Sequence, residues 1–296
     1  MAVANSLTQQ AKKPTVQALI KSDAYQKNIA ATLGDVSKAK TFTSSVISAI
    51  STNPALGECS APSIISAALL GESLKLSPSP QLGQYYMVPF NNKDGKVAQF
   101  QLGYKGYIQL AIRSGQYRRI NVMAIKQGEL IRFDPLAEEI EVNLIQDELV
   151  REKTPTIGYY AMFELVNGFK KAMYWPKEKM EAHALKYSKG YQAKKGYTFW
   201  EKDFDGMAYK TMLRQLISKW GVMSIDMQTA MINDMAAINN DGTPNYVDNS
   251  GTDLNETIEA EYIEKKQESV EQPTTVATME DSDDAFEESF FAGGTI

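Results

Sequence analysis

The chain has 296 residues, of which 43% are hydrophobic and 23% charged, values close to those of ordinary soluble globular domains. The absence of any run of 18 uncharged apolar residues excludes a transmembrane helix, and the polar first 14 residues argue against a secretion signal. One cysteine and one histidine exclude a disulfide framework and a Cys/His zinc cluster, and they favour a reducing compartment.

The net charge of −5 conceals two opposite regions. Residues 1–240 carry 29 Lys and Arg against 21 Asp and Glu, a net charge of +8, whereas residues 241–296 carry 2 against 15, a net charge of −13. A basic body favours a polyanionic partner, and the acidic end favours a regulatory or interaction segment. The alternative is a neutral enzyme with a solvated acidic tail.

The first predicted elements are helices. Apolar side chains recur at helical spacing in residues 15–52, where Gly34 separates two helices and Pro54 follows the second. Ser60 before Pro62 predicts the start of a further helix. We interpret residues 1–55 as a helical N-terminal segment that serves oligomerisation.

Two β-hairpins are predicted next. The first joins strands 84–90 and 97–102 through a polar turn, and the second joins strands 157–166 and 169–175 through Asn-Gly, a pair suited to type I′ turns. Further strands are expected at 120–125 and 139–145, and helices at 104–114, 177–187, 205–220 and 225–238. Hairpins mixed with helices predict an α+β fold, with an antiparallel sheet packed against helices, over a core of residues 56–240.

The acidic end, residues 241–296, is poor in core-forming side chains. It cannot bury enough apolar surface to offset the entropy of ordering, so we predict a disordered tail. Phe286, Phe290 and Phe291 lie among acidic residues near its end. Such hydrophobic anchors are typical of a short partner-binding motif, with an inert end as the alternative.

Several enzyme classes lack their motifs. The sequence contains no GxxxxGK[ST] phosphate loop and no GxGxxG between a strand and a helix. The single histidine, His183, falls in a predicted surface helix and is not expected to be catalytic. A metal-dependent DNA nuclease remains the alternative function, with Asp203 and Asp205 as ligands. However, these carboxylates also suit the start of a helix, and the acidic run 138–141 suits the wet face of a strand.

Two basic segments carry the stronger signal. Residues 93–133 contain eight Lys and Arg against two Asp and Glu, and residues 170–219 contain twelve against five, with Tyr, Phe, Trp and Gly interleaved. Cations neutralise phosphates and release counterions, while aromatic faces stack on bases of any sequence. Solvated faces and core aromatics are the alternative for these residue types.

The predicted DNA contacts come from both segments. Lys210 and Arg214, four residues apart, would share one helix face. The predicted phosphate contacts are Lys105, Arg113, Arg118, Arg119, Lys186, Lys189, Lys194, Lys195, Lys210 and Arg214. The predicted packing or stacking residues are Tyr104, Tyr107, Tyr191 and Trp200.

At these residues the chain resembles the RecT family of phage single-strand annealing recombinases. The resemblance spans roughly residues 60–235 and rests on the runs 74–78, 84–90, 98–111, 113–115, 186–188 and 204–211, together with Trp200. One departure is Lys75 in Leu74-Lys75-Leu76, where a small residue such as glycine is expected more often.

The resemblance implies an ATP-independent, cofactor-free protein without bond-making chemistry. Such a protein binds single-stranded DNA, anneals complementary strands and forms homo-oligomeric rings or helical filaments. Its core would be Rad52-like, a curved antiparallel sheet against a helix. The family also implies a partner 5′–3′ exonuclease and contact with the host single-strand-binding protein through the C-terminal tail, in the cytoplasm of a bacterial host cell.

Overall fold

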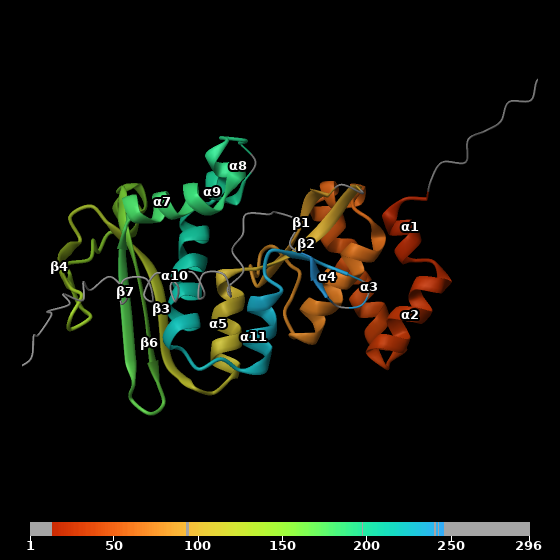
Figure 1. The fold of residues 1–296 in the computed structure, drawn as a ribbon, viewed down its shortest axis with the longest axis horizontal. Coiled ribbons are helices and arrows are strands. Elements are labelled where there is room, and N and C mark those ends of the chain that lie inside the picture. Colours follow the sequence, from red (N-terminus) through yellow and green to blue (C-terminus); the bar gives the residue numbers. More distant parts are fainter. Residues whose placement is uncertain (1–13, 93–94, 197, 240, 242, 246–296) are drawn as a thin grey trace, which may run out of the picture. The chain divides into compact units, whose positions relative to one another are not determined.

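Three helices come first in the part of the chain that the structure describes. The computed structural model describes residues 14–92, 95–196, 198–239, 241 and 243–245 (Figure 1). These include α1 (Val16–Ile20), α2 (Asp23–Leu33) and α3 (Val36–Thr52). Gly34 ends α2 with φ +67°, and the Asp35 carboxylate accepts the Ser37 N–H to start α3. The predicted break at Gly34 is therefore confirmed, although α1 and α2 divide the first predicted helix.

The first sheet is built on the predicted hairpin. After a short 3-10 helix, η1 (Pro54–Glu58), α4 (Ala61–Ser73) begins at Ser60 as predicted. Strands β1 (Tyr85–Asn92) and β2 (Gly95–Leu102) pair antiparallel, and β2 also pairs with β8 (Ala236–Ile238), which pairs with β9 (Pro244–Asn245). The Ser63 hydroxyl of α4 accepts the Ala98 N–H of β2 at 2.9 Å, so α4 packs against this sheet.

The prediction of a helix over residues 225–238 is wrong for the second half of that range. Helix α11 (Ile225–Ile232) ends at Asn233, and Met235 adopts φ +68° while its N–H donates to the Phe100 carbonyl of β2. The following residues then form β8 on the edge of β2. Pairing with a distant strand thus overrides the local helical pattern.

The second sheet has the order β3-β6-β7 and is antiparallel throughout. It contains β3 (Tyr117–Lys126), β6 (Thr156–Leu165) and β7 (Lys170–Pro176), with the predicted Asn167-Gly168 turn between the last two. Strands β4 (Leu130–Asp134) and β5 (Glu139–Val142) form a separate pair. Strand β4 and helix α6 (Glu148–Lys153) were not predicted.

Helix α10 (Phe204–Trp220) is the centre of the core around this sheet. It packs against β3, β6 and β7 and also contacts α5 (Tyr104–Arg113), which contacts α11 (Figure 1). The fully buried side chains here include Tyr159, Phe163, Met212, Leu213, Leu216 and Ile217. Helices α7 (Lys177–Tyr187), α8 (Lys189–Gln192) and α9 (Phe199–Lys202) precede α10. The predicted α+β fold with antiparallel sheets and helices is confirmed.

The predicted domain boundaries stay predictions. All described residues belong to one compact unit, residues 1–251, which includes the helical segment 1–55 from Val16 onward. Except for Asp241 and residues 243–245, the predicted tail lies outside the described residues. Within the described ranges, no helix is both long and apolar enough to cross a membrane.

Candidate nucleic-acid interface

A β-bulge places two neighbouring arginines on the exposed side of β3. Tyr117 pairs with Leu165 and Arg119 pairs with Glu164, so Arg118 is the extra residue of the bulge. Tyr117 is buried, whereas the Arg118 and Arg119 side chains are 66% and 72% exposed. Simple alternation would send consecutive side chains to opposite faces, so the bulge is what creates the arginine pair.

One buried carboxylate orients this pair. The Arg118 Nη1 donates to the Glu164 Oε1 at 3.3 Å, and the Arg119 Nε and Lys170 Nζ each lie 4.0 Å from Glu164 Oε2. Three cations therefore surround a single negative charge. The excess positive charge faces solvent, where a phosphate can reach it.

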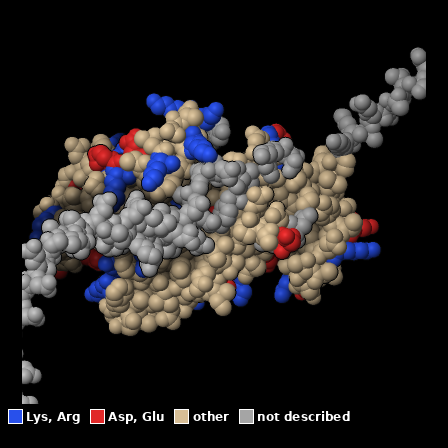
Figure 2. Space-filling model, viewed as in Figure 1, with Lys and Arg blue, Asp and Glu red and all other residues tan. Residues whose placement is uncertain are grey.

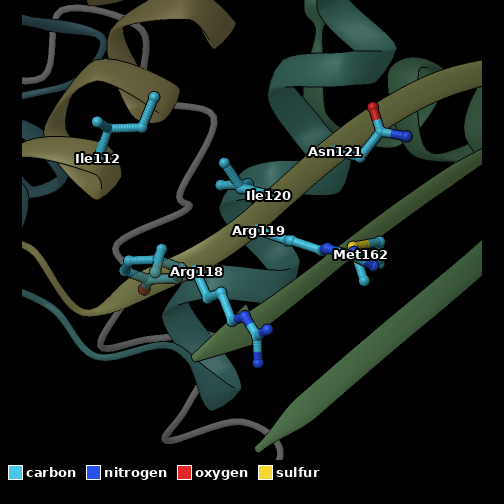
Figure 3. Close-up of a pocket in the computed structure, with 7 residues that line it drawn as sticks. Ile112, Arg118, Arg119, Ile120, Asn121 and Met162 are labelled. Carbon is cyan, nitrogen blue, oxygen red and sulfur yellow. The ribbon is translucent and has the colours of Figure 1, made fainter. Parts of the chain in front are cut away.

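A hollow of about 490 Å³ lies beside the arginines (Figure 3). Its apolar lining comes from α5 and from the sheet, while the arginines and an amide provide polar groups. The lining residues are Ile112, Tyr117, Arg118, Arg119, Ile120, Asn121 and Met162. Guanidinium groups beside an apolar surface suit a nucleotide, which combines a phosphate with a flat base.

Four further predicted cations lie on the segment from the end of α7 to the loop before α9. Lys186, Lys189, Lys194 and Lys195 are all exposed, and Figure 2 shows Lys and Arg side chains gathered over this part of the chain. The loop after α8 is held by Glu201, whose carboxylate accepts the Gly196 N–H at 2.7 Å and completes a capping box with Thr198. Lys194 and Lys195 are thus presented from a loop that these bonds hold in place, while Lys186 and Lys189 lie on α7 and α8.

The aromatic residues under this loop pack on one another. The Trp200 ring is 7% exposed and lies 5.1 Å from the Phe204 ring, and the Tyr191 ring lies 6.2 Å from both. Trp200 is therefore a packing residue here. Phe199, which is not among the predicted site residues, is 38% exposed, and its ring centre lies 5.7 Å from that of Tyr86. The position of Phe199 directly after the lysine-rich loop in the sequence is the feature that could have identified it.

Helix α5 divides its predicted residues between surface and core. Lys105 is exposed near its start, and Tyr104 packs edge-on against Tyr209 at 5.4 Å. Tyr107 is fully buried, so direct DNA stacking does not suit it. Arg113 is exposed but donates to the Leu74 carbonyl at 2.6 Å and to the Lys75 carbonyl at 3.3 Å. Arg113 therefore also caps the end of α4.

Lys210 and Arg214 share a helix face as predicted, but that face meets a buried carboxylate. The Asp234 Oδ1 lies 2.8 Å from Lys210 Nζ, and the Asp234 Oδ2 lies 2.8 Å from Arg214 Nη1. Burial lowers the pKa of Lys210, which is 6% exposed, whereas Asp234 favours its charged form. This burial is at odds with a phosphate contact for Lys210. The sequence did not lead us to predict Asp234 as the partner of these cations, although it is the one acidic residue of 227–240.

The two aspartates of the nuclease alternative have structural partners. Asp203 is the N-cap of α10 and accepts the Gly206 N–H at 3.0 Å. Asp205 accepts a hydrogen bond from the Tyr159 hydroxyl at 2.6 Å. Within the part of the chain that the structure describes, no group of three or more His, Cys, Asp or Glu is arranged to hold a metal ion.

Comparison with known proteins adds an independent line of evidence. Residues 40–248 match the model of the RecT family. The chain is 38% identical over 265 residues to "Uncharacterized protein YqaK" of Bacillus subtilis (strain 168), across 89% of this chain and 85% of that protein. It is 32% identical over 185 residues to "Protein RecT" of Escherichia coli (strain K12), across 61% and 65% of the two chains. The chain therefore belongs to the RecT family, the phage-type single-strand annealing proteins of DNA recombination.

Proposed function

We propose that the protein holds single-stranded DNA on its exposed cations and pairs it with a complementary strand without ATP. The observation that carries this proposal is the bulge-generated pair, Arg118 and Arg119, beside a hollow with an apolar lining. Membership of the RecT family supports binding to single-stranded DNA. The other proposed phosphate contacts are Lys105, Arg113, Lys186, Lys189, Lys194 and Lys195.

Annealing requires no covalent chemistry from these residues. Two strands repel each other through their phosphates, and each cation that meets a phosphate reduces this repulsion and releases a counterion. Holding one strand extended also lowers the entropy cost of aligning the second. Lys210 and Arg214 contribute indirectly, because their shared contact with Asp234 ties α10 to β2 and to the end of α11.

The assembly and the partners of the protein extend the proposal. Copies of the chain would line up in rings or helical filaments, with the helical segment 1–55 in the subunit contacts. The protein would act in the cytoplasm of a bacterial host with a 5′–3′ exonuclease that produces the single strand. The acidic residues after Asn245 would contact the host single-strand-binding protein. Family membership is the support for these points.

An annealing assay tests the function. One oligonucleotide is mixed with the protein, its complement is added without ATP, and duplex formation is followed beside a non-complementary control. We expect rapid, complement-dependent pairing with both strands intact. Binding without faster pairing would reduce the protein to a single-strand-binding module. Magnesium-dependent degradation of a labelled strand would instead favour the nuclease.

The double variant Arg118→Gln/Arg119→Gln tests the site. Loss of two phosphate contacts should lower the slope of log K against log salt by about 1.4 and weaken binding about 25-fold at 0.1 M salt. Glutamine can still donate to Glu164, and a thermal melt checks the fold. Lys153→Gln/Lys177→Gln, which removes two charges from α6 and α7 outside the segment 1–55, is the matched control. Equal losses in both double variants would show that only net charge matters.

A further inference from the structure

Helix α4 ends in a motif that usually contains glycine. The Lys75 N–H donates to the Glu72 carbonyl at 2.9 Å, and the Leu76 N–H donates to the Gly71 carbonyl at 2.9 Å. These two bonds define a Schellman motif, whose residue after the C-cap has a left-handed backbone. Lys75 occupies that position with φ +53°.

Helix α8 ends in the same way. The Lys194 N–H donates to the Tyr191 carbonyl at 3.0 Å, and the Lys195 N–H donates to the Gly190 carbonyl at 3.1 Å. Lys194 is the left-handed residue, with φ +49°. Both motifs therefore have a lysine where the backbone favours glycine.

The ends of two other helices use glycine for the same backbone conformation, and the other two non-glycine residues with positive φ, Glu138 and Met235, each make a hydrogen bond within the protein. The left-handed residue at the end of α2 is Gly34, with φ +67°, and the one that follows α5 is Gly115, with φ +70°. A side chain in this region brings Cβ close to the following carbonyl oxygen and destabilises the folded state. The two lysines thus persist at positions where glycine would relieve strain.

Neither lysine is retained for a contact within the protein. Both are exposed, and neither ammonium makes an ion pair or a side-chain hydrogen bond with any residue that the structure describes. A cation at the end of a helix can neutralise its last carbonyls. At α4, however, Arg113 already donates to the carbonyls of Leu74 and Lys75. The Lys75 ammonium remains available to a ligand.

The position of Lys75 connects it to the arginine pair. Its carbonyl accepts from Arg113, and the residue before Arg113, Ile112, lines the hollow beside Arg118 and Arg119. Lys194 lies in the second group of exposed cations, between α8 and α9. Lys75 thus contacts the helix that lines the hollow, and Lys194 belongs to the second basic group.

We propose that Lys75 binds a backbone phosphate of single-stranded DNA at the end of α4, and that both left-handed lysines exchange stability for this charge. The proposal rests on the proposed function, because it requires that the bound polyanion is a single strand. Strained residues that persist without an internal partner are characteristic of binding sites. The proposal predicts that replacing such a lysine with glycine raises the stability of the fold and weakens DNA binding.

Three substitutions at Lys75 separate strain from charge. Lys75→Gly removes both, so the melting temperature should rise by ~2 °C while binding weakens about fivefold at 0.1 M salt, with a salt slope lower by about 0.7. Lys75→Gln keeps the strain and removes the charge, so only binding should weaken. Lys75→Arg keeps both and should behave as the wild type. The same three substitutions at Lys194 should repeat the pattern.

The measurements are fluorescence anisotropy with a labelled oligo-dT at several salt concentrations, and thermal unfolding of the full chain without DNA. If Lys75→Gly and Lys75→Gln bind as tightly as a wild type that binds and anneals, the inference is wrong and the proposed function stands. If Lys75→Gly is less stable than the wild type, the exchange of stability for charge is refuted. A wild type that fails to bind oligo-dT overturns the proposed function, and this inference with it.

Discussion

At the scale of single residues, the Asp234 carboxylate fixes the positions of the groups around it. Its two carboxylate oxygens meet Lys210 and Arg214 of α10, and Oδ1 also accepts the Leu102 N–H of β2 at 2.9 Å. Asp234 is 1% exposed, so its charge is compensated entirely by groups of the protein. One side chain therefore holds α10, β2 and the end of α11 together.

Removal of this carboxylate should be costly. Asp234→Ala removes the counter-charge of the buried Lys210 ammonium, and we expect a loss of ~3–5 kcal/mol in the free energy of unfolding, measured in urea. Glu58→Ala, which breaks the exposed pair with Lys96, should change stability little. A similar, small effect of both substitutions would mean that the Asp234 cluster does not stabilise the fold.

The sequence indicated which cations belong to the site, but it did not indicate which side chains those cations contact. Helical spacing placed Lys210 and Arg214 on one face, but spacing within a helix cannot identify a carboxylate twenty residues away that buries this face. The departure at Lys75 was visible in the sequence as a missing glycine. Its physical meaning, a left-handed backbone with φ +53°, depends on how α4 ends and required the structure.

At the scale of elements, helix α7 packs against strand β7 through its histidine, His183. The His183 ring lies 5.6 Å from the Trp175 ring of β7 and 4.5 Å from the Tyr187 ring. Burial lowers the pKa of His183 to about 4, with smaller contributions from the positive charges of Arg214 and Lys186. The predicted surface helix thus turns its single histidine toward the sheet.

This pKa makes stability depend on pH. Unfolded histidine titrates near 6.5, so the neutral ring stabilises the fold fully above pH 6.5, and this contribution is lost as pH falls toward 4. We expect the free energy of unfolding to fall by ~1–2 kcal/mol between pH 7.5 and 5. His183 is the only histidine of the chain, so His183→Phe should remove most of the decrease. An equal decrease in this variant would assign the effect to other groups.

Local patterns predicted elements well where a turn or cap determines them. Both hairpins and the starts of α4 and α10 were confirmed because Asn-Gly, Ser and Asp act within a few residues. The bulge at Arg118 and the strand β8 were not predicted, since both depend on a partner strand far along the chain. The arginine pair is therefore a product of tertiary register.

At the scale of the whole molecule, charge is divided along the chain. Residues 246–296 carry 14 Asp and Glu against two Lys, while residues 1–240 have a net charge of +8. An acidic segment tethered to a basic body competes with DNA for the same cations, at an effective concentration set by the tether. We infer that the acidic residues weaken DNA binding.

Deletion of residues 246–296 should therefore tighten binding to oligo-dT. The deletion begins after β9, so the pairing of β9 with β8 is retained. Binding isotherms at low and high salt compare the shortened chain with the full chain, and the gain should shrink as salt screens the charges. Unchanged or weaker affinity of the shortened chain at low salt would contradict the competition.

The pairing of β2 with β8 also has a consequence for the order of events during synthesis. Gln99 pairs with Ala237, and the Leu102 N–H donates to the Asp234 carboxylate. The first sheet is therefore complete only after residues more than 130 positions later in the chain have been synthesised. Contacts between such distant residues slow folding, and an incomplete chain exposes an unpaired strand edge. A nascent chain that has not yet reached Asp234 displays Lys210 and Arg214 without their carboxylate. Ribosome-bound fragments of this protein therefore cannot complete the first sheet until almost the whole described region has emerged.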